Sequence, residues 1–210
     1  MSNTKISQLF DKMANVYDQW FDDNPRVVAA EIAAIRQVTL PFNHALEVGV
    51  GTGRFAEALG IKLGVEPSVA MANLARARGI EVVEGFAQAL PYADVTFDTL
   101  FMITVDCYLE QLTPVLRECH RVLLPSGVLV IGHIDIDTPL GALYQAEKEK
   151  DVFYRDATFR GTNTIIDKLK QTGFEVEAIR QTVSTLENID HEVRFGHGDG
   201  VFVALRARKC

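Results

Sequence analysis

Short apolar runs alternate along the chain with stretches in which apolar residues recur at helical spacing. Such alternation is typical of a parallel sheet whose strands are joined by crossover helices. One run, FDTLFMITV at 97–105, is apolar nearly throughout, as expected for a central strand that is buried on both faces. The full pattern predicts an α/β fold with seven strands, at residues 44–50, 61–66, 81–85, 97–105, 128–134, 174–183 and 201–208.

Residues with capping preferences mark the ends of the predicted helices. Asn24 and Pro25 stand at the first positions of one helix, and Ser68 is expected to cap another. Thr162 is the expected cap of the last helix, which ends at Gly173. The two strands after Gly173 follow one another with no helix between them. They therefore form a hairpin, and the sheet is expected to end with an antiparallel strand.

The length of the chain fits a single domain spanning 1–210. Residues 1–40 are predicted to form N-terminal helices. Residues 139–161, rich in aromatic and charged side chains, form an insertion between the fifth strand and the last helix. At that place the insertion is expected to lie over a ligand pocket as a lid. An amphipathic helix packed on the domain is the alternative of equal weight.

Composition restricts the partners. A net charge of −7 and a pI of about 5.2 argue against nucleic acid, which needs clustered Lys and Arg. The one basic cluster, 206–209, is interpreted as a solvated tail. No apolar run or signal peptide indicates a membrane or export, so a cytoplasmic protein is expected. Three cysteines without a CxxC pair predict neither a disulfide nor a metal site.

The segment LEVGVGTGRFA at 46–56 lies between the first strand and the first crossover helix. Glycines there let the backbone turn tightly and approach a ligand, and the helix N-terminus supplies free N–H donors. Glu66 ends the next strand, where a carboxylate could hold ribose hydroxyls. Because Gly51-x-Gly53-x-x-Ala56 also satisfies a dinucleotide pattern, this segment alone leaves an NAD-dependent enzyme open.

Further motifs follow in order. GVEPS stands at 64–68, LP at 90–91 with FD at 97–98, and RVLLPSG at 121–127. Together with the glycine segment, they make the chain resemble the class I S-adenosylmethionine (SAM) dependent methyltransferases. The resemblance is to the small-molecule group similar to the ubiquinone and menaquinone biosynthesis methyltransferases. It implies a Rossmann-like, doubly wound, seven-stranded sheet that is mostly parallel, with an antiparallel seventh strand beside the fifth.

The resemblance also implies SAM as the cofactor and S-adenosylhomocysteine as its product. Gly49 to Gly53 would pack against the methionyl and ribose parts, Glu47 would orient the amino-acid end, and Glu66 would accept both ribose hydroxyls. Many members carry an acid for the adenine where this chain has Phe86. The cofactor-binding residues implied are Glu47, Gly49, Val50, Gly51, Thr52, Gly53, Glu66, Pro67, Ala87, Gln88 and Thr104.

Methyl transfer requires in-line positioning of a nucleophile, and a base only if the acceptor must lose a proton. The candidates for catalysis are His133, Asp106 and Tyr108, which follow strands at the ligand-binding edge of such sheets. A His satisfied by nearby backbone is the alternative for His133. A small-molecule acceptor is expected against the aromatic residues Tyr17, Trp20, Phe153 and Tyr154. A SAM-binding protein without catalysis stays open, as do the acceptor atom and the oligomeric state.

Overall fold

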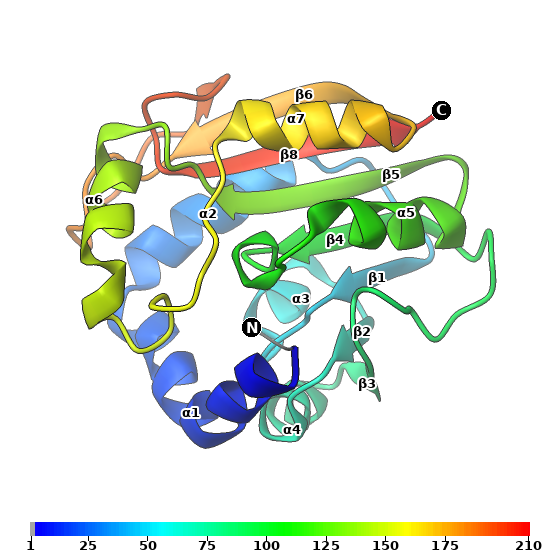
Figure 1. Ribbon diagram of the computed structural model, residues 1–210, viewed down its shortest axis with the longest axis horizontal. Coiled ribbons are helices and arrows are strands. Elements are labelled where there is room, and N and C mark those ends of the chain that lie inside the picture. The colour runs from blue at the N-terminus through cyan, green and yellow to red at the C-terminus, as the bar shows by residue number, and fades with distance from the viewer. Residues whose placement is uncertain (1–2) are drawn as a thin grey trace.

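The computed structural model describes residues 3–210, so residues 1 and 2 of the predicted segment 1–40 lie outside the described residues. The described chain folds around one eight-stranded sheet in the order β3-β2-β1-β4-β5-β8-β6-β7 (Figure 1). The strands are β1 (Ala45–Val48), β2 (Leu63–Glu66), β3 (Glu81–Glu84), β4 (Phe97–Ile103), β5 (Leu123–Ile134), β6 (Phe174–Thr182), β7 (Arg194–Phe195) and β8 (Phe202–Lys209).

Helices cover both faces of this sheet (Figure 1). The α-helices are α1 (Asn3–Asp23), α2 (Pro25–Val38), α3 (Arg54–Leu59), α4 (Val69–Ala77), α5 (Leu112–Val122), α6 (Pro139–Glu147) and α7 (Thr162–Gln171). Two short 3-10 helices, η1 (Asp106–Tyr108) and η2 (Lys148–Lys150), follow β4 and α6. The fold is therefore a three-layer α/β/α arrangement.

The strand directions confirm the predicted class I methyltransferase sheet. Strands β1 to β5 pair in parallel, and β8 is inserted antiparallel between β5 and β6. The structure adds one strand to the seven expected, because the two residues of β7 pair antiparallel with β6. A two-residue strand is too short to leave a periodic pattern in the sequence.

Two hydrophobic cores lie on opposite faces of the sheet, because successive strand residues point to opposite sides. In β4, Phe101 and Ile103 belong to the core that α2, α3 and α4 cover. Leu100 and Met102 belong to the other core, beneath α5 and α7. All four side chains are at most 3% exposed, which confirms that β4 is buried on both faces.

The capping predictions had mixed outcomes. Ser68 caps α4 as expected, and its Oγ accepts a hydrogen bond from the Met71 N–H. Asn24 occupies the N-cap position of α2, but its side chain donates to the Trp20 carbonyl instead. Thr162 is not a cap, because α7 begins at Thr162 and its N-cap is Gly161. The Thr162 side chain is used in a buried network described below.

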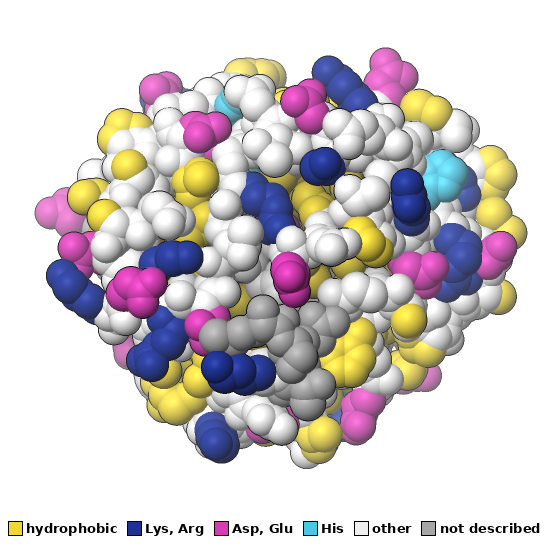
Figure 2. All heavy atoms as spheres, in the orientation of Figure 1, with side chains coloured by type: hydrophobic (Ala, Val, Ile, Leu, Met, Phe, Trp, Pro, Cys, Tyr) yellow, Lys and Arg dark blue, Asp and Glu magenta, His cyan; other side chains and the backbone are white. Residues whose placement is uncertain are grey.

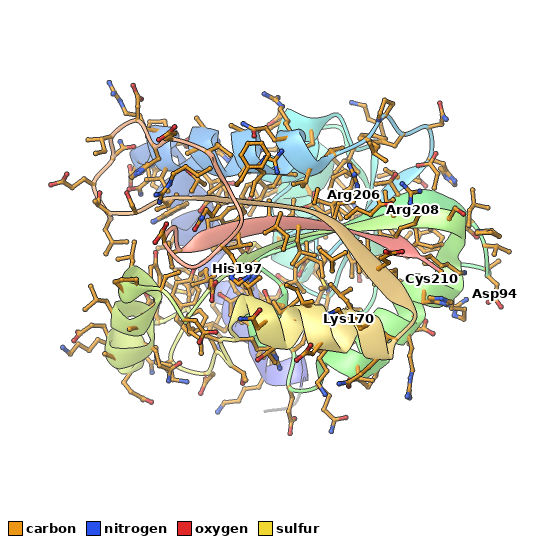
Figure 3. All side chains as sticks on the ribbon, turned by 90° about the horizontal axis from the view of Figure 1, so that it is seen from above. Asp94, Lys170, His197, Arg206, Arg208 and Cys210 are labelled. Atoms are coloured by element: carbon orange, nitrogen blue, oxygen red, sulfur yellow. The ribbon has the colours of Figure 1, made fainter. Side chains whose placement is uncertain are left out.

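The basic cluster 206–209 is not a solvated tail but part of β8 (Figure 3). The Arg206 Nε lies 2.9 Å from a Glu177 oxygen, and Lys209 Nζ donates to the His120 carbonyl. Elsewhere, Figure 2 shows acidic and basic side chains interspersed over the face in view, with no continuous basic patch there. Within residues 3–210, no helix is long and apolar enough to cross a membrane.

Candidate cofactor and acceptor site

The glycine turn after β1 brings bare backbone to the edge of the sheet. Gly49 has φ +73°, and a Cβ at this position would lie 2.5 Å from a Val105 methyl carbon, so only glycine fits. Gly51 also has a positive φ, +55°, but a Cβ there would meet nothing within 4 Å. Its backbone therefore faces open space, as a turn that approaches a ligand must.

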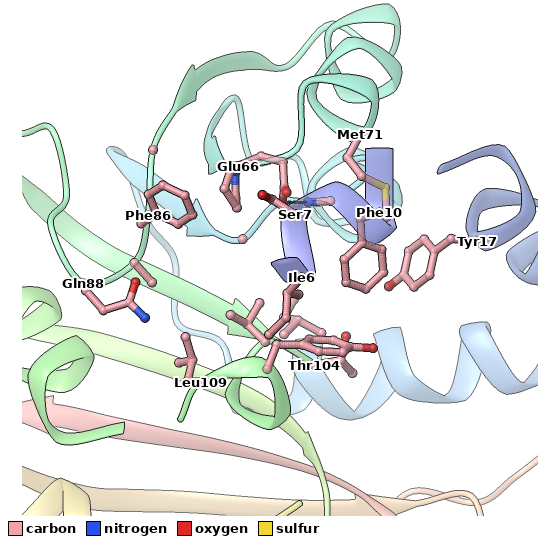
Figure 4. Close-up of a pocket in the computed structure, with 18 residues that line it drawn as sticks. Ile6, Ser7, Phe10, Tyr17, Glu66, Met71, Phe86, Gln88, Thr104 and Leu109 are labelled. Atoms are coloured by element: carbon pink, nitrogen blue, oxygen red, sulfur yellow. Dashed lines mark hydrogen bonds between the residues drawn. The ribbon is translucent and has the colours of Figure 1, made fainter. Parts of the chain in front are cut away.

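A first pocket of about 730 Å³, open to solvent, lies beside this turn (Figure 4). Figure 4 shows Phe86, Gln88 and Leu109 on one side of it and Phe10, Tyr17 and Met71 on the other. The lining residues are Ile6, Ser7, Phe10, Tyr17, Gly49, Gly51, Glu66, Pro67, Met71, Gly85, Phe86, Ala87, Gln88, Ile103, Thr104, Val105, Tyr108 and Leu109. These residues fit SAM, because the pocket combines glycine backbone, one carboxylate and apolar walls.

Glu66 is the one acidic side chain in this lining and is 7% exposed. One carboxylate oxygen accepts the Ser68 N–H at 2.9 Å, and the other accepts the Gly51 N–H at 3.0 Å. Burial raises the pKa of Glu66 to about 7, although these two hydrogen bonds oppose the shift. Each oxygen keeps a second lone pair, so the carboxylate can still accept two ribose hydroxyls.

Helix α1 forms one wall of the first pocket, and the side chains of two of its aspartates bind it to the rest of the domain. Asp11 accepts hydrogen bonds from the Ser68 hydroxyl at 2.7 Å and the Ala70 N–H at 3.1 Å, at the start of α4. Asp18 forms ion pairs with Arg54 at 2.7 Å and Arg78 at 2.8 Å. Although burial acts against it, these partners lower the pKa of Asp18 to about 2. The shape of the first pocket therefore depends on the position of α1.

A second pocket of about 1140 Å³ adjoins the first. Aromatic side chains dominate its wall, and four of its residues come from the segment 139–161. The lining residues are Tyr17, Trp20, Phe21, Asn24, Val27, Glu31, Phe55, Thr104, Ile134, Tyr144, Asp151, Phe153, Tyr154, Val183, Leu186 and Val201. Tyr17 and Thr104 line both pockets, so the two spaces meet at these side chains.

Most of the residues predicted for the site lie at these two pockets. The first is lined by Gly49, Gly51, Glu66, Pro67, Ala87, Gln88, Thr104 and Tyr108, and the second by Tyr17, Trp20, Phe153 and Tyr154. Four predicted cofactor residues line neither pocket: Glu47, Val50, Thr52 and Gly53. Glu47 belongs to β1, and Val50, Thr52 and Gly53 are buried within the glycine turn itself. Glu47 is 2% exposed, and burial raises its pKa well above the usual range.

His133 lines neither pocket and is fully buried where β5 approaches α7. The Thr162 hydroxyl donates to Asp135 at 2.7 Å, and His133 Nε2 lies 3.0 Å from the same hydroxyl. Since that hydroxyl has one proton, it must accept from His133 Nε2–H. Burial lowers the pKa of His133 to about 4, so the ring is neutral. The geometry is that of a structural network joining β5 to α7.

Asp106 also lies outside both linings and is 2% exposed. Burial raises its pKa to about 7, and the charge of Arg160 opposes the shift. Arg160 donates to the Asp106 and Leu109 carbonyls, and so ties the turn after β4 to the segment 139–161. Tyr108, from the same turn, does reach the first pocket and packs edge-on against Phe10 at 5.1 Å.

Sequence reasoning missed Glu31, which lines the second pocket from α2. Burial raises its pKa to about 8. The signal that could have found it is that Glu31 is the single acidic residue in the helix PRVVAAEIAAIRQV.

Comparisons with known proteins agree with this geometry. The methyltransferase domain family matches residues 46–131. A SAM-dependent methyltransferase of Thermotoga maritima, described as a possible histamine N-methyltransferase, has a crystal structure that covers 98% of this chain and 100% of its own. Its sequence is 37% identical and its TM-score is 0.93.

Two relatives extend the comparison. An uncharacterized protein of Methanocaldococcus jannaschii is 40% identical over 203 residues, which is 96% of this chain and 98% of that protein. The demethylmenaquinone methyltransferase of Chlorobaculum parvum is 33% identical over 144 residues, 62% of this chain and 60% of that enzyme. The chain belongs to the SAM-dependent methyltransferases, and is therefore an enzyme whose cofactor is S-adenosylmethionine. The antiparallel strand β8 separates it from the all-parallel dinucleotide alternative.

Proposed function

We propose that this methyltransferase binds SAM in the first pocket and a small organic acceptor in the second, and that the methyl group is transferred where the pockets meet. The observation that carries this proposal is that Tyr17 and Thr104 line both pockets. In-line displacement needs the nucleophile and the methyl carbon to face one another at close range. A shared wall between two ligand pockets meets that requirement.

The residues have separable tasks. Bound SAM supplies an electrophilic methyl group on a positively charged sulfur. Gly49, Gly51 and Glu66 hold its methionyl and ribose parts, while Phe86 and the backbone of Ala87 and Gln88 enclose the adenine. The aromatic side chains of the second pocket exclude water and orient an apolar body.

The segment 139–161 acts as a lid in this proposal. It contributes Tyr144, Asp151, Phe153 and Tyr154 to the second pocket. Two of these aromatic side chains also stack on residues outside the segment. Phe153 stacks on Phe10 with ring centroids 5.8 Å apart, and Tyr154 stacks on Tyr108 at 6.4 Å. An acceptor enclosed by such a roof is a small or medium molecule rather than a polymer. The net charge of −7 also disfavours a nucleic acid.

The experiment narrows the second pocket while leaving the first intact. Val27 is 5% exposed and lines only the second pocket, so Val27→Phe places an aromatic ring inside it. Calorimetry with S-adenosylhomocysteine should show the wild-type affinity. Transfer of labelled methyl groups from SAM to a metabolite extract should fall at least about tenfold, since even small steric errors at a reacting pair cost that much.

Leu124→Phe, at an exposed position on β5 outside both pockets, is the control and should leave both measurements unchanged. Wild-type turnover by Val27→Phe would mean that the acceptor lies elsewhere. Failure of the wild-type protein to bind S-adenosylhomocysteine would reject the assignment of the first pocket.

A further inference from the structure

The ionisable side chains that line the second pocket include acids but no bases. Its lining contains two carboxylates, Glu31 and Asp151, and no Lys, Arg or His. The other polar groups are the neutral side chains of Asn24, Thr104 and the aromatic residues. An anionic acceptor would find no cation there and would oppose ionisation of the two carboxyl groups, whereas a cationic acceptor would stabilise their ionised forms.

Glu31 is the acid best placed to take part. Asp151 already accepts the Phe153 and Tyr154 N–H groups with one oxygen. Among the side chains that the structure describes, Glu31 has no basic partner, and burial alone raises its pKa to about 8. The titratable groups that face it are Tyr17 of α1, Tyr144 of α6 and Tyr154 of the lid, all of which are neutral at pH 7.

A half-buried carboxylate without a cation is unfavourable, because its charge has lost water without gaining a partner. A ligand cation would remove that penalty. The surrounding rings would add to the attraction, since the faces of Trp and Tyr attract ammonium groups. Trp20 and Tyr17 of α1 and Tyr154 of the lid line the same space as Glu31.

We infer that the acceptor is a primary or secondary amine that binds as its ammonium ion. Its nitrogen lies at Glu31, and its apolar body lies against the aromatic wall. Glu31 accepts the proton that the nitrogen must lose. This inference rests on the proposed function, because it assigns the chemistry of the acceptor in the same second pocket. It also assigns a catalytic residue, since Glu31 would touch the reacting nitrogen.

The proton and electron balance is simple. The proton passes from the ammonium nitrogen to a Glu31 oxygen, and the nitrogen regains its lone pair. That lone pair forms the new nitrogen–carbon bond, while the electron pair of the broken sulfur–carbon bond stays on sulfur. The product nitrogen then carries the positive charge, and Glu31 returns its proton to water. No oxidant, reductant or metal is needed.

The test compares three probes of similar shape and different charge. 2-Phenylethylamine, 2-phenylethanol and 3-phenylpropanoate would be titrated by calorimetry into wild-type protein saturated with S-adenosylhomocysteine. Tryptamine would be included as a larger amine. We expect at least one amine to bind about tenfold or more tightly than the alcohol, which is the effect of a charge-assisted hydrogen bond. The carboxylate probe should not bind.

Two variants locate the effect. Glu31→Gln should lower amine affinity at least about tenfold and leave the affinities for the alcohol and for S-adenosylhomocysteine unchanged. Glu175→Gln makes the same change of charge at an exposed position of β6, away from both pockets, and should alter none of them.

The inference is overturned if neither amine binds, if the alcohol binds as tightly as the amines, or if Glu31→Gln binds amines like the wild type, each with S-adenosylhomocysteine binding intact. Loss of S-adenosylhomocysteine binding in the wild-type protein would instead reject the proposed function. The two failures are therefore distinguishable.

Discussion

The backbone N–H of Gly51 donates a 3.0 Å hydrogen bond to a carboxylate oxygen of Glu66, and this bond joins the turn after β1 to the end of β2. The other oxygen of Glu66 accepts the Ser68 N–H at the start of α4. One buried side chain thus holds the glycine turn in place and presents its remaining lone pairs to the first pocket. Binding and local order should therefore respond differently to two substitutions at this position.

Glu66→Ala should weaken the binding of S-adenosylhomocysteine by about 1.5 to 3 kcal/mol, the range for losing a hydrogen bond to a charged group. Glu66→Gln should lose less, because its amide oxygen can still accept one N–H group. Calorimetry on both variants measures the difference, with circular dichroism to check that the fold is intact. Unchanged affinity in Glu66→Ala would contradict the assignment of Glu66 to the ribose.

Asp18 is expected to control cofactor affinity without touching the cofactor. Asp18→Asn removes the charge that pairs with both Arg54 and Arg78 and should loosen α1. The affinity for S-adenosylhomocysteine should fall several-fold, and protease cleavage within α1 should become faster. Asp22→Asn is the control, because Asp22 is 54% exposed and an exposed ion pair contributes only about 0 to 1 kcal/mol. Equal behaviour of the two variants would show that α1 does not depend on the Asp18 pairs.

The order of the sheet and part of the lining of the first pocket could be predicted from the sequence, because both depend on local signals. Buried strands leave apolar runs, and the glycine turn and Glu66 stand at fixed places after β1 and β2. The predicted helix starts were less reliable. The residue type at Thr162 suggested a helix cap, but it did not show that this hydroxyl would donate a hydrogen bond to Asp135, which lies 27 residues earlier in the chain.

The second pocket was harder to predict because its walls come from distant segments. Glu31 on α2 faces Tyr144 and Tyr154 more than a hundred residues later, and no spacing in the sequence records that approach. His133 shows the reverse case. Its place at the end of β5 indicated a ligand-binding edge, but its side chain turns toward α7 and is sealed there by Thr162.

The network of His133, Thr162 and Asp135 is expected to serve stability. Thr162→Val keeps the shape but removes the hydroxyl, leaving the carboxylate oxygen and the imidazole N–H without their partner. Stability should fall by about 1 to 3 kcal/mol, the cost of a buried unsatisfied polar group. Michaelis constants and turnover at temperatures below unfolding should stay near the wild-type values. Thr164→Val, at an exposed position of the same helix, is the control. A selective loss of turnover would place the network in catalysis.

Glu31 should also give the stability of the ligand-free protein a particular dependence on pH. Burial raises its pKa in the folded state to about 8, above the usual value of 4.5. Between these two values the folded protein holds a proton that the unfolded chain has released, so this contribution to stability is lost as pH rises through 8. Glu66 and Asp106, both at about 7, act in the same direction, whereas His133, at about 4, acts in the opposite direction below its ordinary value of 6.5.

Comparison of variants separates the contribution of Glu31 to the pH dependence of stability from the contributions of these other groups. Glu31→Gln is neutral at every pH, so its melting temperature should rise relative to the wild type between pH 5 and 8.5 and then keep a constant offset. Each kcal/mol lost should lower the melting temperature by about 2 to 4 °C in a chain of this size. Differential scanning calorimetry of the wild type, Glu31→Gln and the control Glu175→Gln at half-unit pH steps measures the offset. Saturating amine should reduce the pH-dependent part of the offset, because a bound ammonium ion favours the ionised carboxylate. For this comparison, S-adenosylhomocysteine is present in all samples. Curves for the wild type and Glu31→Gln that stay parallel across this range would show that Glu31 keeps an ordinary pKa and is not the isolated acid of the second pocket.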